Sequence, residues 1–361
     1  MNSPDQLKKI MELVTKPEGN TPIHNCMLLL KDKARGLDFS EALGLTGTEG
    51  KNITVDSCFR TGSITKLFTA TLILQLAEEG LLKTEDLYFD LINEDSKAFL
   101  TGLHLWNGED HSSKISIHHL LSHSTGLRDY FSEDERFLGI VMEHPLQSWS
   151  WKGIMEKYFE FELHKNPAFI PGKGFHYADT NYLLLAVLIE QITGKQLHEV
   201  YREKIISPLG LVNTYLEYYE TPGRMNQVVF PFYGIHSLEN INTSFDWGGG
   251  GLISSMDDLD IFIRSLMKSV LFKKPETLDL MLQLRNHKPS LESSGSSFHY
   301  GLGIQKKDFP GFSFFGHNST FGSMLYYEPE NDISLILSLS QFTAMHKAEW
   351  MMNKIITGLL K

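Results

Sequence analysis

The chain has 361 residues, which is long enough for about two lobes with separate cores. Hydrophobic residues make up 42% and charged residues 21%, a globular balance that excludes wholesale disorder. The net charge of −11, without a basic block, excludes a nucleic-acid binder and a polybasic membrane patch. The two cysteines, Cys26 and Cys58, are too few for a disulfide scaffold or a Cys-rich metal cluster, and we expect free buried thiols.

The first part of the chain predicts a helix, a strand pair and a second helix. Apolar residues recur at helical spacing over Gln6–Val14. Short apolar runs over His24–Lys31 and Phe39–Leu45 are typical of paired strands. Ser63–Glu79 repeats apolar residues at helical intervals, and Gly80 supplies a stop signal.

Helical stretches and turn signals alternate through the middle of the chain, where strand-like runs are few. The clearest helices are Ile117–Ser122 and Asn181–Thr193. The glycine run Gly248–Gly251 ends this region. A helix then begins at Ser254 or Ser255 as N-cap and runs to about Val270.

The C-terminal part returns to strand character. Its four predicted strands are Tyr300–Lys306, Phe312–Gly316, Ser323–Glu328 and Ile333–Ser340. A helix over Ala344–Leu360 closes the chain, and the Ser- and Gly-rich stretch Ser290–Ser297 predicts a surface loop.

These elements predict an α+β fold with strands at both ends of the chain. Residues 1–81 and 252–361 would form an antiparallel sheet flanked by helices, and residues 82–251 a mainly helical inserted lobe. The cleft between the lobes is the expected place for a ligand. The longest apolar runs are shorter than the ~18 residues of a membrane span. The first residues are polar and lack the apolar region of a secretory signal, so we expect a cytoplasmic location.

The first chemical motif is Ser63-Ile64-Thr65-Lys66, directly after Gly62. On a helix this spacing places the Ser63 hydroxyl and the Lys66 amine on one face, about one turn apart. An amine of lowered pKa could remove the serine proton. The alternative is an ordinary helix start, because the same spacing occurs by chance at Ser265 and Lys268.

Two further motifs could carry chemistry. Tyr177 and Asp179 stand in a glycine-containing loop before a helix, where a tyrosine can act as acid or base; alternatively Tyr177 is an interface aromatic and Asp179 an N-cap. His317-Asn318-Ser319 lies between two predicted strands, where a polar stretch suits an edge that binds a ligand; the alternative is a hairpin turn.

The fifteen histidines call for a metal test. His119 and His123 have the i, i+4 spacing of zinc ligands, but no carboxylate accompanies them in the pattern of a metalloprotease. We therefore favour structural packing for both, and expect neither a metal nor a cofactor.

The three motifs occur in the order and approximate spacing found in the class C beta-lactamase and penicillin-binding-protein superfamily, which the sequence resembles over roughly residues 20–360. Residues 117–127, 177–186 and 249–254 also resemble scaffold stretches of that group. The group contains beta-lactamases, D-alanyl-D-alanine carboxypeptidases, D-aminopeptidases and esterases. The resemblance implies a beta-lactamase/transpeptidase-like fold.

The resemblance also implies a role for each motif residue. Ser63 would be the acylated nucleophile, Lys66 its activator and Tyr177 the proton shuttle. His317 would face the substrate. The backbone N–H groups of Ser63 and Thr320 would form the oxyanion hole.

Two positions depart from the family pattern. Relatives often have Asn where this chain has Asp179, and the extra negative charge should hold Lys66 protonated. Most have Gly where this chain has Ser319, so we expect a narrowed slot that disfavours bulky beta-lactams.

The resemblance therefore implies a serine hydrolase that cleaves an ester or a small amide of a small-molecule acyl substrate through an acyl-enzyme. A beta-lactamase or D-alanyl-D-alanine peptidase is the alternative within the superfamily. The alternative from another class is a binding protein on the same fold that has lost turnover.

Overall fold

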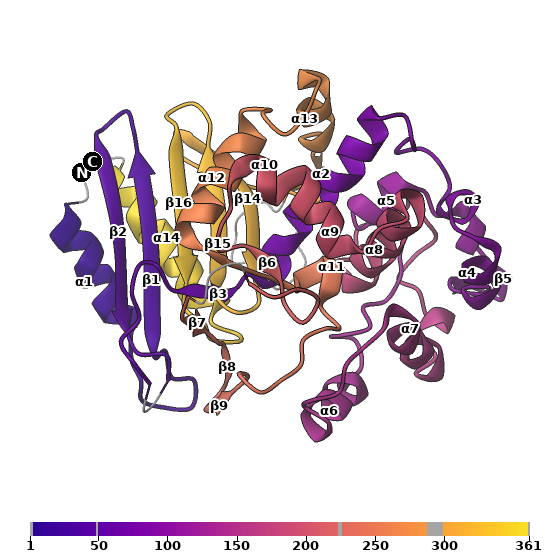
Figure 1. Ribbon diagram of the computed structural model, residues 1–361, viewed down its shortest axis with the longest axis horizontal. Helices are drawn as coiled ribbons and strands as arrows, with labels where there is room; N and C mark the ends of the chain where they lie inside the picture. Colours follow the sequence, from indigo (N-terminus) through magenta and orange to yellow (C-terminus); the bar gives the residue numbers. More distant parts are fainter. Residues whose placement is uncertain (1–2, 48–49, 223–225, 287–298, 360–361) are drawn as a thin grey trace.

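An eight-stranded antiparallel sheet brings the two ends of the chain together (Figure 1). The computed structural model describes residues 3–47, 50–222, 226–286 and 299–359. The strands, in spatial order, are β11 (Arg285–Asn286), β12 (His299–Tyr300), β13 (Gln305–Phe309), β14 (Phe312–Ser319), β15 (Ser323–Glu328), β16 (Ile333–Ser338), β1 (Asn25–Asp32) and β2 (Leu37–Gly44). Because β1 pairs with β16, with Leu29 opposite Ile336, the predicted α+β fold is confirmed.

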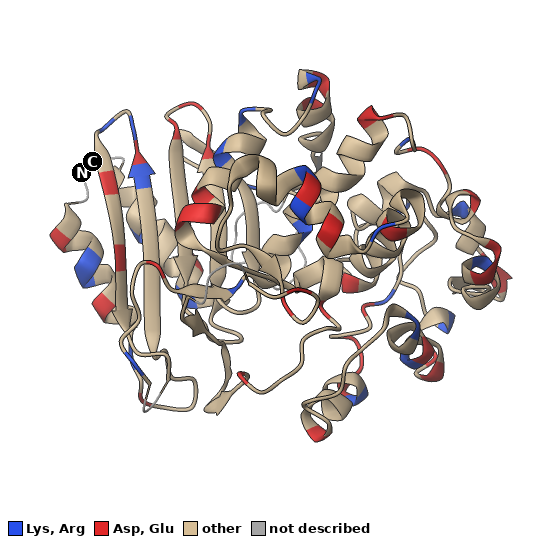
Figure 2. Ribbon diagram, in the orientation of Figure 1, with Lys and Arg blue, Asp and Glu red and all other residues tan. Residues whose placement is uncertain are grey.

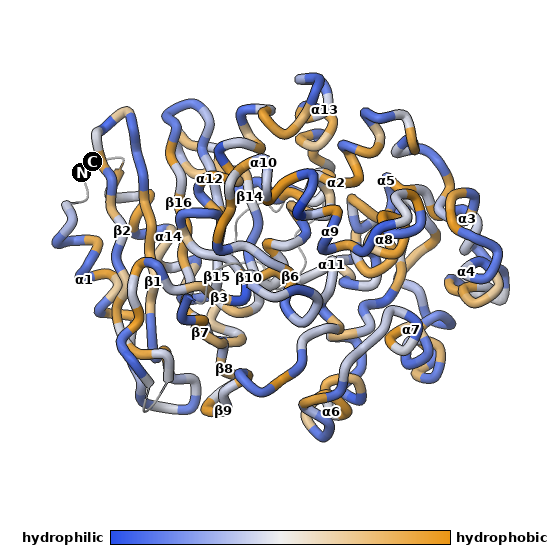
Figure 3. Tube along the Cα trace, viewed as in Figure 1, coloured by the Kyte–Doolittle hydropathy of each residue, from blue (hydrophilic) through white to orange (hydrophobic). Residues whose placement is uncertain are grey.

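Helices cover both faces of this sheet, because its strands alternate side chains between the faces. In β1, Leu28 and Leu30 pack with one helix pair, while Met27 and Leu29 belong to the larger core on the other side. Figure 3 shows the hydrophobic character of the sheet strands and of the helices around them. The first face carries α1 (Pro4–Val14) and α14 (Met345–Leu359); the second carries α2 (Thr65–Glu78) and α12 (Met256–Met267). Cys26 and Cys58 are buried free thiols, as the sequence predicts.

The middle of the chain is mainly helical. Its helices are α3 (Tyr88–Leu91), α4 (Glu94–Phe99), α5 (Ile117–Leu121), α6 (Glu135–Glu143), α7 (Trp151–Glu160), α8 (Asp179–Thr193), α9 (Leu197–Tyr201), α10 (Ser207–Leu209) and α11 (Trp247–Gly250). The hairpins β4 (Leu105–Trp106) with β5 (Glu109–Asp110) and β8 (Phe232–Tyr233) with β9 (His236–Ser237) interrupt them. Figure 2 shows Lys and Arg positions interspersed with Asp and Glu positions along the ribbon in both parts of the molecule. Every helix of the described residues is too short or too polar to cross a bilayer.

A second, four-stranded sheet joins the two parts. Its order is β6 (Tyr215–Leu216), β10 (Leu252–Ser255), β3 (Cys58–Arg60) and β7 (Val228–Val229). The strands β3 and β10 come from the segments assigned to the sheet lobe, and β6 and β7 from the insert. Residues on either side of the proposed boundaries therefore share a sheet.

The structure differs from the predicted elements in four places. The strand β14 extends to Ser319, so it contains the third motif, which was expected between two strands. Ser63 lies in a short 3-10 turn, η1 (Gly62–Ile64), and the α-helix begins only after it. The predicted strand Tyr300–Lys306 is split into β12 and β13 by a turn in which Gly303 has a φ of +79°. The helix expected to reach Val270 ends at Met267. The stretch Ser290–Ser297 lies outside the described residues.

Candidate active site

The Ser63 hydroxyl and the Lys66 amine are in direct contact. The 3-10 turn leads straight into α2, so Lys66 lies one turn beyond Ser63, and its side chain is fully buried. The Lys66 Nζ donates to Ser63 Oγ at 3.0 Å and to the carbonyl of Gly249 at 2.8 Å. The glycine run of α11 therefore places a backbone carbonyl within hydrogen-bond distance of the amine.

Asp179 supplies the counter-charge to this buried amine. Its carboxylate forms an ion pair with Lys66. The N-cap of α8 is Ala178, so Asp179 is the first helical residue and does not cap the helix. Burial alone would lower the pKa of Lys66, but the negative charge of Asp179, followed by Tyr177, outweighs burial and raises it. This agrees with the expectation that Asp179 holds Lys66 protonated.

Tyr177 lies over the same amine. The Lys66 Nζ is 5.1 Å from the centre of the tyrosine ring, and the ring of His123 packs on Tyr177 with 4.2 Å between centroids. Burial raises the pKa of Tyr177 to about 12, against the lowering influence of the Lys66 charge. Tyr177 is therefore neutral near pH 7, with a small phenolate fraction that grows as the pH rises.

His317 belongs to a buried chain of hydrogen bonds. Its Nδ1 is 2.7 Å from the carbonyl of Asn318, which can only accept, so Nδ1 carries the proton. Its Nε2 is 3.1 Å from the Tyr300 hydroxyl, which is also 3.2 Å from the Nε2 of His123. Burial, followed by the Lys66 charge, lowers the pKa of His317 to about 3, so this imidazole is neutral.

His123 is fixed by the loop and helix of the second motif. Its Nδ1 is 3.2 Å from the backbone N–H of Ala178 and 3.0 Å from the side-chain nitrogen of Asn181, both donors. Nδ1 therefore accepts, and the His123 proton lies on Nε2, toward Tyr300. His119 caps its own helix with Ser116. In the described part of the chain, no group of three or more His, Cys, Asp or Glu side chains is arranged to hold a metal ion.

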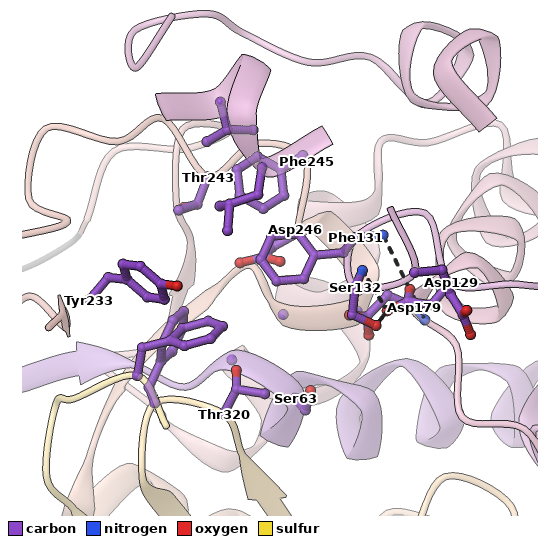
Figure 4. Close-up of a pocket in the computed structure, with 18 of the residues that line it drawn as sticks. Ser63, Asp129, Phe131, Ser132, Asp179, Tyr233, Thr243, Phe245, Asp246 and Thr320 are labelled. Atoms are coloured by element: carbon purple, nitrogen blue, oxygen red, sulfur yellow. Dashed lines mark hydrogen bonds between the residues drawn. The ribbon is translucent and has the colours of Figure 1, made fainter. Parts of the chain in front are cut away.

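A cavity of about 700 Å³ opens above Ser63 (Figure 4). Tyr177, Asp179 and Thr320 also line it. The rest of the wall is largely apolar and aromatic, with further carboxylates; it includes Phe131, Phe175, Phe245, Phe321, Phe342, Val141, Met142, Ile241, Asp129, Glu133 and Asp246. The first and second motifs thus meet at one cavity, together with the residue that follows the third.

A comparison with models of protein families assigns the chain to a family. The model described as Beta-lactamase matches residues 39–352. The chain belongs to the Beta-lactamase family. It is 30% identical over 179 residues to unguisins hydrolase ungD' of Aspergillus campestris, covering 49% of this chain and 31% of that protein. It is 28% identical over 195 residues to penicillin-binding protein 4* of Bacillus subtilis, covering 53% and 38%. The matches thus span only about a third of these relatives.

Solved structures of this family support the fold over nearly the whole chain. A D-stereospecific amidohydrolase from Streptomyces sp. superposes with a TM-score of 0.78 at 24% identity, covering 96% of this chain and 97% of that one. EstCE1, a hydrolase with promiscuous acyltransferase activity, gives a TM-score of 0.72 at 20% identity, covering 94% and 95%.

The third motif lies behind the surface of the cavity, except for Thr320, the residue that follows it. His317 and Ser319 are buried and lie outside the set of residues that line the cavity, so substrate contact by either side chain stays a prediction. Because side chains alternate along β14, His317 and Ser319 lie on the same face of this strand. A Cβ on Gly62 would lie 2.2 Å from the Ser319 Oγ, so this hydroxyl packs against the nucleophile turn.

Sequence reasoning missed part of the cavity wall. Asp129, Phe131, Phe245 and Asp246 come from irregular segments that follow α5 or precede α11. No spacing pattern marks them, since loops carry no helical or strand period. The one available signal was position, because Asp246 stands two residues before the glycine run that begins at Gly248.

Proposed function

We propose that this protein is a metal-free serine hydrolase that cleaves an ester or a small amide through a covalent acyl-enzyme. The observation that carries the proposal is the Ser63 hydroxyl, bonded to a buried, charged Lys66 amine at the wall of an apolar cavity. Such an arrangement orients a serine oxygen toward a bound carbonyl group.

The charges assign the proton-transfer step to Tyr177. Lys66 is held protonated by Asp179, so it can donate but cannot accept. The Tyr177 phenolate takes the Ser63 proton while the serine oxygen bonds to the substrate carbonyl carbon. Tyr177 then gives this proton to the leaving oxygen or nitrogen as its bond to that carbon breaks. A water molecule repeats the sequence on the ester of Ser63 and releases the acid.

The developing negative charge on the carbonyl oxygen needs donors. Ser63 and Thr320 both line the cavity, and we assign their backbone N–H groups to the oxyanion hole. Removing one such donor typically costs about 3 kcal/mol of transition-state stabilisation. The neutral imidazole of His317 is hydrogen-bonded to the Tyr300 hydroxyl, which is also within hydrogen-bond distance of the His123 imidazole beside Tyr177.

The similar proteins suggest two candidate substrate classes. The amidohydrolase and EstCE1 support a small amide or ester, and the apolar cavity suits a small acyl group. Penicillin-binding protein 4* supports a beta-lactam or a D-alanyl-D-alanine peptide as the second candidate.

Covalent labelling tests the proposal. We expect a fluorophosphonate probe to add one mass increment to the intact protein, with the modified peptide containing Ser63. Ser63→Ala should abolish labelling and Ser265→Ala should leave it intact. Absence of labelling would favour the non-catalytic binding protein. Turnover of p-nitrophenyl acetate, nitrocefin and a D-alanyl-D-alanine peptide then ranks the substrate classes.

A further inference from the structure

Asp246 is a carboxylate that lines the cavity and has no side-chain partner in the described part of the chain. It directly precedes α11, and Figure 4 shows it among the side chains that line the cavity, which also include Phe131. The carboxylate lies against Gly250, where a Cβ would be 3.3 Å from its Oδ1. Among the described residues, none forms a hydrogen bond or an ion pair with this carboxylate.

The other carboxylates that line the cavity each have a hydrogen-bond or ion-pair partner. Asp179 is paired with Lys66. Asp129 accepts from the backbone N–H of Asp179 at 2.9 Å and from that of Ser132 at 3.1 Å. Glu133 contacts the His176 imidazole at 2.6 Å and the Arg128 guanidinium at 3.4 Å.

The described cavity wall therefore carries more negative than positive charge. It contains four carboxylates and no Lys or Arg side chain, and the nearby Lys66 is already paired. Burial, followed by the negative charge of Asp179, raises the pKa of Asp246 to about 7. An ionised carboxylate in such a wall is costly unless a cation approaches it.

The surroundings of Asp246 suit an organic cation. The rings of Phe131 and Phe245 stack with centroids 5.6 Å apart and planes 15° apart, and both line the same cavity. Aromatic faces attract ammonium groups, and apolar walls accept the carbon atoms that such groups carry. A carboxylate beside aromatic rings discriminates an amine from its uncharged analogue.

We propose that Asp246 binds a positively charged group of the substrate, so that this cavity selects esters or amides that carry a protonated or quaternary amine. This inference rests on the proposed function, because it assigns specificity to the same cavity. The cation can belong to the acyl part, as in an aminoacyl amide, or to the leaving group, as in a choline-type ester.

Two pairs of substrates that differ in the cationic group separate these sources. Phenylalanine p-nitroanilide, in both enantiomers, is compared with hydrocinnamic acid p-nitroanilide, which lacks only the amine. Acetylthiocholine is compared with neohexyl thioacetate, its uncharged carbon analogue. The kcat/KM of each is measured for the wild type, for Asp246→Asn and for the control Glu239→Gln, an exposed carboxylate outside this cavity.

In at least one pair, we expect the wild type to favour the cationic member by about 30-fold or more, the scale of a buried charge contact. The pair that shows the preference locates the cation. Asp246→Asn should remove most of it, and Glu239→Gln should retain it. Equal kcat/KM values within both pairs, or a preference that Asp246→Asn leaves intact, would overturn the inference.

Fluorophosphonate labelling separates this inference from the proposed function. Labelled Ser63 without a cation preference refutes the role of Asp246 alone, whereas an unlabelled wild type refutes the hydrolase itself. Equal labelling of Asp246→Asn and wild type shows that the variant keeps its site, so that a lost preference is due to the lost charge.

Discussion

The same i, i+3 spacing of a serine and a lysine occurs at Ser63–Lys66 and at Ser265–Lys268, but the two lysines have opposite surroundings. Lys66 is fully buried and bonded to Ser63 at 3.0 Å. The Lys268 side chain is 45% exposed and pairs with Asp332 across the surface at 3.0 Å. In both pairs the lysine follows the serine by three residues, so the spacing alone does not distinguish the two sites.

The difference lies in what surrounds each lysine. The glycine run of α11, the start of α8 and the strand β14 all pack against η1 or α2, so the Lys66 amine is enclosed by fixed partners. Lys268 is partly exposed and shares Asp332 with Arg264 and Lys33, so the loss of this one exposed cation costs little stability. We therefore expect chemistry at the first site only.

Replacing each serine should produce the largest difference between the two sites. Ser63→Ala should lower ester kcat/KM by a factor of about a thousand or more, because the covalent route is lost. Ser265→Ala should retain wild-type activity. The measurements are p-nitrophenyl acetate turnover and the thermal midpoint, which should stay unchanged in both. Normal turnover by a folded Ser63→Ala would disprove the assignment.

Removal of each lysine extends the comparison to stability. Lys66→Met should lower activity by about a hundredfold or more and destabilise the fold by about 2 kcal/mol, because Asp179 loses its buried partner. Lys268→Met should change the free energy of unfolding by less than about 0.5 kcal/mol. Urea unfolding measures the free energy of unfolding of both variants. Equal decreases in the two variants would contradict the difference in burial between the two lysines.

Tyr177→Phe probes the proton path at the first site. Loss of the hydroxyl should reduce kcat by about a hundredfold while KM changes by less than about threefold, since proton transfer belongs to the transition state. Tyr218→Phe, an exposed tyrosine, is the control. A variant that loses affinity but keeps its kcat would show that Tyr177 only forms a wall.

The charge of Asp179 sets the pH range of the site. Its carboxylate raises the pKa of both Lys66 and Tyr177, so activity that needs a deprotonated group should increase with pH. Asp179→Asn removes that influence, and the acidic limb of the kcat/KM profile should move to lower pH. The exposed Asp257→Asn is the control. An unmoved limb, or one displaced to higher pH, would contradict this electrostatic assignment.

The smallest expected effect is at Ser319. The sequence alone predicts that Ser319→Gly favours nitrocefin over p-nitrophenyl acetate. Because the hydroxyl packs against Gly62 and accepts from the Phe321 N–H at 3.3 Å, we expect a loss of about 1 kcal/mol of stability instead. Turnover of both substrates should fall by a similar factor, about threefold. A selective gain for nitrocefin would restore the original interpretation.

Much of the fold could be predicted because its signals are local. The apolar periods of α2 and α8, and the short runs of β1, β15 and β16, reflect interactions between near neighbours in the chain. The three motifs were found for the same reason, since each is a few residues long. Where local signals conflict, as in the Gly301–Gly303 turn, the prediction was wrong.

By itself, the sequence determined the α+β layout, the order of the motifs and the pairing of Ser63 with a lysine one turn away. The tertiary structure alone decided which lysine is buried, that His317 and Ser319 are buried, and that Asp246 lies in the cavity wall with no hydrogen-bond or ion-pair partner among the described residues. The reason is that burial and charge pairing depend on segments far apart in the chain. The Lys66 amine contacts both the Asp179 carboxylate and the Gly249 carbonyl, which come from distant parts of the chain. No local sequence spacing predicts that these groups lie close together.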